Sequence, residues 1–259
     1  MNKLNMFCLT MEPNHFQFIN EIGYTPVGLG ENSFGKGWFT DKNGENISKK
    51  NKYYGEYTYH YWLWKNYLDQ IDEGWIGFCQ YRKFWSTQEH KNESINLKNI
   101  NGKVLKYIPE SLNEYETILG KPIFINQFKS MKFIKKGFKL FLKNPTLVFN
   151  KNKRSINFHF NLMHGENNLN KAIELLDNDN KHDFKDFVNS EVSFNPHNMF
   201  ICNSKIKLKK YYETLFEWLL KCEKIFGFED LKGYDKTRIY GFLAERFLSY
   251  WFKKNTKYT

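Results

Sequence analysis

The sequence predicts an α/β fold with a mixed, mostly parallel sheet and helices on both of its faces. Short apolar runs typical of buried strands occur at residues 4–11, 75–81 and 198–203. Stretches with helical periodicity separate these runs, which is the alternation that builds a layered sheet. The chain has 259 residues, of which 41% are hydrophobic and 19% aromatic, enough to form one packed core. We therefore expect a single domain over residues 1–259.

The N-terminal half begins with the strand-like runs "LNMFCLTM" and "TPVGLGE", which a polar, glycine-bearing loop from Asn32 to Asn46 follows. The next segment is predicted to be a helix with one apolar stripe, since its apolar residues recur at alternating steps of three and four. The stripe consists of Tyr54, Tyr57, Tyr61, Trp64 and Leu68. After this helix comes "GWIGFCQYRKFW", a strand whose tip turns polar and basic.

The C-terminal half contains a short helix in "NLNKAIELLDN", a buried strand in "NMFICN" and two longer helices. The first long helix carries one apolar face, made of Leu208, Tyr211, Leu215, Leu219 and Cys222. The last helix starts near Asp235 and contains "TRIYGFLAERFLSYWF". Between the halves, "KPIFINQF" is strand-like, and Ser130–Asn144 alternates Lys with Phe, Ile and Leu like a basic amphipathic helix.

The net charge of +11 favours an anionic partner, which could be nucleic acid, membrane headgroups or a phosphorylated substrate. The excess is mostly Lys and runs through the whole chain, so charge alone does not choose among these partners. The four cysteines are far apart and form no CxxC pair, which predicts free core thiols and a cytoplasmic protein. No apolar run reaches the length of about 18 residues needed to span a membrane.

The basic strand tip consists of Gln80, Tyr81, Arg82 and Lys83. Ligands of open α/β sheets bind outside the carboxyl ends of strands, where this tip is expected. Arg binds phosphate through two parallel hydrogen bonds, and Lys adds a point charge. The alternative is an edge strand with solvated charges, and the pattern alone leaves both readings open.

A second polar group precedes the predicted helix and consists of Asp41, Glu45, Asn46 and Ser48. The free N–H groups of a helix N-terminus bind anions, so this group could face a ligand. One turn apart within the helix, Glu56 and His60 could act on a ligand or pair with each other. The acidic residues are too sparse to specify a metal site.

Two polar groups remain. One directly precedes a strand, and the other lies within the final helix. His197 and Asn198 follow Pro196, where they could bind a hydroxyl-rich ligand or form a turn. Glu245 and Arg246 are embedded in an apolar helical run, where an unpaired carboxylate is costly. Glu245 is therefore either functional or held in an ion pair with Arg238. GxSxG, HExxH, P-loop and GxGxxG motifs are absent, which removes support for the usual hydrolases, metalloproteases, NTPases and dehydrogenases.

Taken in order, these groups resemble a family of bacterial capsule and O-antigen glycosyltransferases, long catalogued as a domain of unknown function, which includes β-galactofuranosyltransferases. The matching positions are Asn43–Ser48, Asn51, Tyr54, Glu56, Thr58, Tyr61–Asn66, Gln80–Lys83, Asn198–Ile201, Tyr211 or Tyr212, Trp218, Leu219, Arg238 and Gly241–Arg246. Three positions depart from the family pattern: Gln80 replaces a His, Glu45 an Asp and Lys83 an Arg.

The resemblance implies a GT-A-like glycosyltransferase that moves a sugar from a nucleotide-diphosphate donor onto a growing capsule or lipopolysaccharide glycan. A UDP-sugar is the expected donor, with UDP-galactofuranose as one option, and the acceptor is a glycan or a lipid-linked glycan. The protein would act in the cytoplasm or peripherally on the inner face of the cytoplasmic membrane. The expected substrate-binding residues are Thr10, Glu31, Asn46, Ser48, Glu56, Gln80, Tyr81, Arg82, Lys83 and Asn198.

GT-A enzymes usually hold a divalent metal through an Asp-x-Asp motif at a strand end, where this chain is expected to carry Gln80-Tyr81-Arg82. Either a metal or fixed cations can neutralise a leaving diphosphate, and these residues favour fixed cations. We therefore assign no metal ligand. Asp41 or Glu45 could instead hold an ion, which keeps Mg²⁺ or Mn²⁺ as the alternative.

An inverting transfer needs a base for the acceptor hydroxyl, and we expect Glu245, with Arg238 and Arg246 as its partners. His197 is the next candidate. A competing class is a non-enzymatic basic module that binds membranes or nucleic acid. The aromatic residues follow core periodicity rather than a base-stacking pattern, so no nucleic-acid partner is expected. The segment Ser130–Asn144 is predicted to lie on the membrane surface or, alternatively, to pack on the core with solvated lysines.

Overall fold

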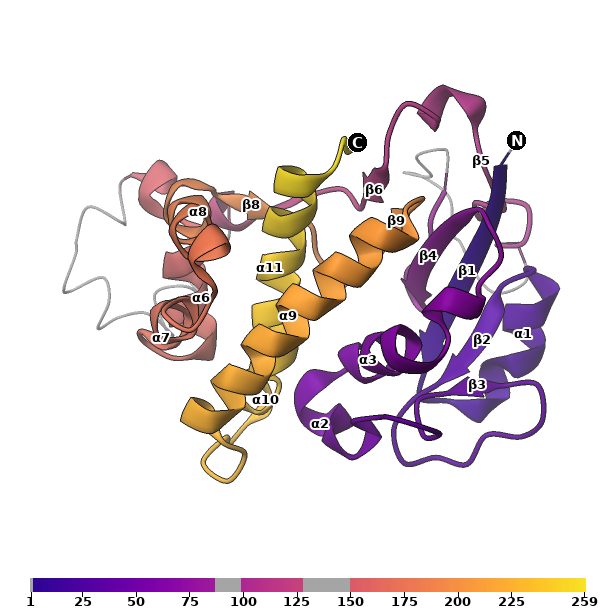
Figure 1. Ribbon diagram of the computed structural model, residues 1–259, viewed down its shortest axis with the longest axis horizontal. Helices are drawn as coiled ribbons and strands as arrows, with labels where there is room; N and C mark the ends of the chain where they lie inside the picture. The colour runs from indigo at the N-terminus through magenta and orange to yellow at the C-terminus, as the bar shows by residue number, and fades with distance from the viewer. Residues whose placement is uncertain (1, 87–98, 128–149) are drawn as a thin grey trace. The chain divides into compact units, whose positions relative to one another are not determined.

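The computed structural model describes residues 2–86, 99–127 and 150–259, which form two compact units (Figure 1). Unit 1 comprises Met1–Gly120, His197–Glu213 and Phe252–Thr259. Unit 2 comprises Lys121–Pro196 and Thr214–Trp251. The predicted amphipathic segment Ser130–Asn144 lies outside the described residues.

Unit 1 is built on a seven-stranded sheet in the order β3-β2-β1-β4-β9-β6, with β5 paired to β1. Its strands are β1 (Asn2–Thr10), β2 (Thr25–Gly28), β3 (Phe39–Thr40), β4 (Trp75–Gln80), β5 (Tyr107–Ile108), β6 (Thr117–Leu119) and β9 (Phe200–Cys202). The three strands predicted near residues 4–11, 75–81 and 198–203 are therefore neighbours in the order β1-β4-β9, as expected. The sheet prediction missed β3, which lies within the segment expected to be a loop.

The sheet is mixed and mostly parallel along β3-β2-β1-β4, whereas β9 runs antiparallel to both β4 and β6. In the parallel part the strand ends are aligned, because Thr10 pairs with Gly28, and Gly28 with Thr40. On the other side of β1, Leu9 pairs with Gln80 at the end of β4. These strand ends form the carboxyl edge of the sheet, and the amino end of β9 lies at the same edge because β9 is antiparallel.

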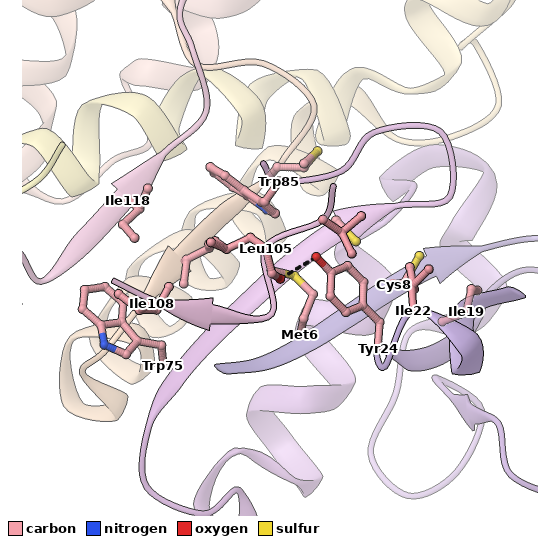
Figure 2. Packing of buried hydrophobic residues seen from close by; sticks show 14 of the residues in the cluster. Met6, Cys8, Ile19, Ile22, Tyr24, Trp75, Trp85, Leu105, Ile108 and Ile118 are labelled. Carbon is pink, nitrogen blue, oxygen red and sulfur yellow. Dashed lines mark hydrogen bonds between the residues drawn. The ribbon is translucent and has the colours of Figure 1, made fainter. Parts of the chain in front are cut away.

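One face of the sheet is covered by α1 (Phe16–Glu21) and by the segment that contains β5. Alternate residues of β1, Met6 and Cys8, point into a core cluster that includes Ile19, Ile22 and residues around β5 (Figure 2). The buried Tyr24 hydroxyl donates a hydrogen bond of 2.7 Å to the Leu105 carbonyl within this cluster. The polar end of this aromatic side chain is thus satisfied inside an apolar core.

The opposite face is packed with aromatic rings from α3 (Tyr57–Asn66) and from the beginning of α9 (Lys205–Phe226). Phe7 of β1 stacks on Phe78 with ring centroids 5.8 Å apart and also contacts Tyr59 at 5.7 Å. On this face His60 lies 4.4 Å from the Phe78 ring. The prediction of helices on both faces of the sheet is therefore confirmed.

The helix predicted around residues 54–68 is divided into α2 (Asn51–Tyr54) and α3. The break lies at Gly55, which has φ +59°, a conformation that glycine adopts without steric cost. The predicted apolar stripe was partly wrong, because Tyr61 and Trp64 are only half-buried. The residues buried instead are Tyr59, His60, Trp62 and Leu63.

Unit 2 is mainly helical and contains one two-stranded sheet of β7 (Ile123–Phe124) and β8 (Ser193–Phe194). Its helices are α6 (Ile156–His164), α7 (Asn168–Ile173), α8 (Asn178–Ser190), α10 (Tyr234–Thr237), the later part of α9 and most of α11 (Ile239–Asn255). Phe184 packs edge-on against Trp218 and Phe247, with ring centroids 5.8 and 5.4 Å apart. The indole of Trp218 also donates to the Ala172 carbonyl at 2.7 Å.

Two further predictions about the core are confirmed. The predicted apolar face of α9 is fully buried at all five of its positions, from Leu208 to Cys222. All four cysteines are free and buried. None of the described helices combines the length and apolarity needed to cross a membrane.

Candidate functional site

The end of β1 carries a polar group built around Thr10, whose side chain is almost fully buried. The Thr10 hydroxyl oxygen accepts a hydrogen bond from the Glu12 backbone N–H at 3.0 Å and lies 2.8 Å from His15 Nδ1. The Thr10 carbonyl accepts from the Leu29 N–H at 2.9 Å, which joins the ends of β1 and β2. His15 is thereby held at the carboxyl edge of the sheet.

The tip of β4 lies against this group through Tyr81. The Tyr81 N–H donates to the Leu9 carbonyl at 3.2 Å, and the Tyr81 ring stacks on the His15 ring with centroids 4.5 Å apart. The Arg82 guanidinium carbon lies 5.0 Å from the centroid of the Tyr81 ring. The structure therefore brings together Thr10, Tyr81 and Arg82, three of the residues expected to bind the donor, and His15 lies among them.

The side chains of Arg82 and Lys83 are exposed and form no ion pair with any residue that the structure describes. Burial lowers the pKa of His15 below its usual value of 6.5, and the Glu12 carboxylate opposes that shift. His15 is thus mainly neutral at pH 7. Arg82, whose guanidinium contacts the same Tyr81 ring as His15, and the neighbouring Lys83 make this part of the edge suited to an anion.

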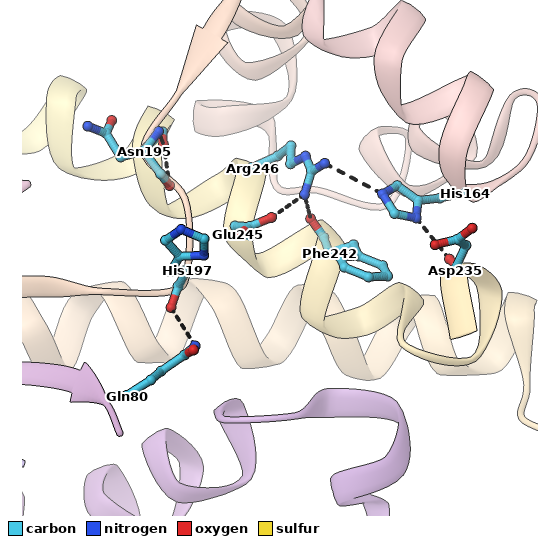
Figure 3. Close-up of polar contacts among 9 residues, drawn as sticks. Gln80, His164, Asn195, His197, Asp235, Phe242, Glu245 and Arg246 are labelled. Atoms are coloured by element: carbon cyan, nitrogen blue, oxygen red, sulfur yellow. Dashed lines mark hydrogen bonds and ion pairs between the residues drawn. The ribbon is translucent and has the colours of Figure 1, made fainter. Parts of the chain in front are cut away.

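Gln80 joins the β4 tip to two other elements. Its side-chain Nε2 donates to Glu56 Oε1 at 3.0 Å. It also donates to the His197 carbonyl at 2.9 Å (Figure 3). These two bonds use both hydrogens of the amide, so a Gln at this position acts as a structural bridge. The structure therefore brings Glu56, Gln80 and His197 together at the amino end of β9.

The backbone is left-handed at His197 and Asn198, with φ angles of +73° and +56°. Non-glycine residues in this region carry backbone strain, and such strain concentrates at functional sites. The Asn198 side-chain oxygen is buried and has no hydrogen-bond partner among the described residues. An amide oxygen left unpaired in this way could accept a hydrogen bond from a ligand hydroxyl.

Other predicted donor residues make their hydrogen bonds elsewhere. Asn46 Oδ1 accepts from the Ser48 N–H at 3.2 Å and from the Ser48 hydroxyl at 2.8 Å, which closes a local turn. Glu45 accepts from the Tyr61 hydroxyl at 2.7 Å and lies 3.6 Å from the Lys65 ammonium. The exposed Glu31 follows Gly30 near the end of β2.

Asp41, which follows β3 directly, is fully buried, and neither of its carboxylate oxygens has a hydrogen-bond partner among the described residues. Burial raises the pKa of Asp41, and the nearby Thr58 hydroxyl opposes the shift only in part. The Thr58 hydroxyl also donates to the Gly55 carbonyl at 3.1 Å. Across the described residues, no three His, Cys, Asp or Glu side chains gather as a metal site.

In unit 2, Arg246 holds Glu245 through a charge-assisted hydrogen bond from Nη1 to Oε2 (Figure 3). Arg246 is only 2% exposed, and its guanidinium carbon lies 4.2 Å from the centroid of the Phe194 ring. Burial lowers the pKa of Arg246, and the Glu245 carboxylate opposes that shift. The pair thus places a carboxylate of fixed orientation within an apolar environment.

His164 supports this pair from the other side. Its Nδ1 lies 2.8 Å from the Asp235 carbonyl, and since a carbonyl can only accept, Nδ1 carries the hydrogen (Figure 3). The remaining nitrogen, Nε2, is then the acceptor that faces Arg246 Nη2 at 3.5 Å. The second predicted partner of Glu245, Arg238, donates to the Tyr234 hydroxyl at 3.4 Å and lies over the Tyr234 ring.

The sequence analysis missed His15 as a site residue. Its only signal was its place in "EPNH", directly after the first strand and before a short helix. It also missed that His60 is a core residue. His60 Nδ1 lies 2.8 Å from the Tyr212 hydroxyl, and complete burial lowers the pKa of His60 to about 3.

Comparison with known proteins places the chain in a family. The family model described as "Domain of unknown function (DUF4422)" matches residues 8–256. No curated protein matches the sequence.

Comparison with solved structures found two matches. The bifunctional glycosyltransferase WbbM, in its apo form, aligns with a TM-score of 0.64 and 20% identity. The alignment covers 100% of this chain and 44% of the WbbM chain. The chain therefore spans less than half the length of WbbM, and the likeness shows the fold alone. The mannosyltransferase Ktr4p from S. cerevisiae aligns over 83% of this chain and 60% of its own with 11% identity. Its TM-score of 0.29 is too low to carry an argument.

The mixed, mostly parallel sheet and the likeness to WbbM together confirm the predicted GT-A-like α/β fold class. The family match covers nearly the whole chain. This protein belongs to the DUF4422 family.

Proposed function

We propose that this protein is a glycosyltransferase that uses a nucleotide-diphosphate sugar, with a UDP-sugar as the expected donor. The observation that carries the proposal is the exposed pair Arg82 and Lys83 at the β4 tip, next to Tyr81 at the carboxyl edge of the unit 1 sheet, where neither forms an ion pair with a described residue. The membership in DUF4422 and the fold likeness to WbbM support the same activity.

In this proposal the donor diphosphate binds to Arg82 and Lys83. A guanidinium can form two parallel hydrogen bonds to a phosphate group, and each charge-assisted bond contributes about 1.5–3 kcal/mol. The same cations stabilise the charge that develops on the diphosphate as it leaves the sugar. Glu56, through its bridge with Gln80, and Asn198 are placed at the same edge to bind hydroxyl groups of the donor.

The transfer requires a base, for which we propose Glu245. Its carboxylate takes the proton of the acceptor hydroxyl while that oxygen bonds to the anomeric carbon of the sugar. The bond from the anomeric carbon to the diphosphate oxygen breaks in the same step, which inverts the configuration. The ion pair with Arg246 supports the assignment because it fixes the carboxylate, and the exposed imidazole of His197 is the other candidate.

The acceptor in our proposal is a capsule or lipopolysaccharide glycan, free or lipid-linked, with UDP-galactofuranose as one donor option. The enzyme would then act in the cytoplasm or on the inner face of the cytoplasmic membrane. These finer points rest on the sequence resemblance, with Glu31, Asn46 and Ser48 as additional donor residues and Arg238 as a further partner of Glu245.

A thermal-shift screen tests the proposal, because a ligand that binds only the native state raises the melting temperature. The panel consists of UDP-galactose, UDP-glucose, GDP-mannose and dTDP-glucose, with CMP-sialic acid as a control that lacks a diphosphate. We expect stabilisation by at least one diphosphate sugar and none by the control. Absence of any shift, together with salt-sensitive RNA or vesicle binding, would instead indicate a non-enzymatic basic binding module.

A further inference from the structure

We propose that His15 binds the donor diphosphate and takes up a proton when the donor binds. The inference deepens the proposed function and rests on it. It adds to the site a residue that is not among the predicted site residues, and it predicts that the affinity for the donor depends on pH.

The first observation behind this inference is the fixed position of the His15 ring. Thr10 lies 2.8 Å from Nδ1, and the Tyr81 ring stacks against the imidazole face at an interplanar angle of 26°. These two contacts fix both the position and the plane of the ring. The other nitrogen, Nε2, forms no hydrogen bond with any described residue and is not sealed in the core. His15 therefore presents one oriented, accessible nitrogen at the carboxyl edge.

The surroundings of His15 carry the second step. The charged and titratable groups that bear on it are Glu12 on its own turn and Tyr81, which stacks on its ring, with Arg82 against the Tyr81 ring and Lys83 further along the β4 tip. Arg82 contacts the same Tyr81 ring on which His15 stacks, and in our proposal one diphosphate contacts both this guanidinium and the imidazole. A diphosphate diester carries two negative charges, which outweigh the single carboxylate of Glu12 nearby.

The direction of the effect follows from charge. In the free protein, burial keeps the pKa of His15 below 6.5, so the ring is neutral at pH 7. A bound diphosphate favours the imidazolium and raises the pKa of the ring. Between the free and the bound pKa values, donor binding is coupled to uptake of up to one proton. In that window the Kd rises by up to about tenfold for each unit of increasing pH.

Isothermal titration calorimetry measures this uptake directly. The probe is whichever of UDP-galactose, UDP-glucose, GDP-mannose and dTDP-glucose stabilises the wild-type protein most. Binding is measured between pH 5.5 and 8, at each pH in two buffers that differ in ionisation enthalpy, and the difference in heat gives the number of protons bound. We expect wild type to take up a substantial fraction of a proton near pH 6.5 and to bind more weakly as pH rises.

Three variants assign the proton. His15→Gln should lose the uptake and the pH dependence and bind about tenfold more weakly at pH 6. His182→Gln, an exposed histidine of α8 paired with Asp186, is the matched control and should retain both. His197→Gln tests the exposed histidine at the amino end of β9: if this variant loses the uptake instead, the proton belongs to His197 and not to His15. Melting curves without ligand establish that each variant is folded.

The outcomes separate the two proposals. If wild type binds a sugar nucleotide without proton uptake, the inference about His15 is wrong while the proposed function stands. Uptake that persists in His15→Gln, or that disappears in His197→Gln instead, overturns it equally. Even if His15→Gln does not fold, donor binding by wild type without proton uptake refutes the inference about His15. If wild type binds none of the four sugar nucleotides, the proposed function fails and the inference falls with it.

Discussion

Replacing Glu245 with Gln should destabilise unit 2, because the change leaves the buried guanidinium of Arg246 without its carboxylate. Arg246 is 2% exposed, and the centroids of three aromatic rings, those of Phe160, Phe194 and Phe242, lie within 6 Å of its guanidinium carbon. Removing one partner of a buried ion pair costs about 3–5 kcal/mol. Glutamine can still accept one hydrogen bond, so we expect a loss near the lower limit, about 3 kcal/mol.

The double variant Glu245→Gln/Arg246→Met distinguishes a charge effect from general damage to packing. Methionine keeps much of the length of Arg246 and removes the buried charge. Replacing a buried ion pair by apolar or neutral groups of similar volume is often neutral in stability. The double variant should therefore be more stable than Glu245→Gln alone, by about 1 kcal/mol or more, which means that the two changes are strongly coupled.

Urea unfolding at pH 7, followed by circular dichroism, measures the free energy of unfolding. The four proteins compared are wild type, Glu245→Gln, Arg246→Met and the double variant. The reasoning is refuted if Glu245→Gln stays within about 0.5 kcal/mol of wild type, the range of ordinary surface changes. It is equally refuted if the losses of the two single changes simply add. In either case Arg246 would not depend on the charge of Glu245.

Two further predictions concern catalysis and pH. If Glu245 is the base, Glu245→Gln should lower kcat by about 100-fold or more with saturating donor and acceptor. Release of the nucleoside diphosphate measures kcat, and the variant is first shown to be folded. Near wild-type turnover in Glu245→Gln, with a large loss in His197→Gln, would assign the role to His197. Acid should also destabilise the fold, because burial lowers the pKa values of both His60 and His159 to about 3. The unfolded chain protonates these rings below about pH 6.5 and the folded chain does not, so stability falls from pH 6.5 towards pH 3, by about 2 kcal/mol per histidine at pH 5. Equal urea midpoints at pH 7 and pH 5 would contradict this.

The central strands could be predicted because their apolar runs are short and bounded by polar or glycine residues. The apolar face of α9 was predictable for a similar reason, since its five buried positions are separated by polar residues. In both cases one local periodicity fits the sequence much better than any other. The neighbouring order β1-β4-β9 then follows from packing buried strands side by side.

The helix before β4 was harder because aromatic residues surround it on every side. Gly55 interrupts this helix, and the turn changes which of the following residues face the core. Tyr59 and Trp62 are therefore buried, where Tyr61 was expected. His60 was expected on the polar face beside Glu56, yet its partner is Tyr212, which lies 152 residues further along the chain. A local sequence pattern cannot indicate a contact between residues so far apart in the chain.

The candidate site shows the same limit. The abrupt change from apolar to basic residues at the tip of a strand was the signal for proposing Arg82 and Lys83. His15 was not, because its role depends on a stack with Tyr81 across two strands. The sequence likewise favoured Arg238 and Arg246 together as partners of Glu245. The structure shows the ion pair with Arg246, its neighbour in the chain, and the role of Arg238 stays a prediction.

The most direct test of the central claim, that the carboxyl edge of β1 and β4 binds a nucleotide-diphosphate sugar, is the donor affinity of Arg82→Ala measured by calorimetry. Lys209→Ala is the matched control, since this surface lysine of the same unit already pairs with Asp69. Loss of one or two charge-assisted hydrogen bonds should weaken donor binding at least tenfold in Arg82→Ala. The control should bind as tightly as wild type, and both variants should melt near the wild-type temperature. Equal donor affinity in Arg82→Ala and wild type would contradict the account.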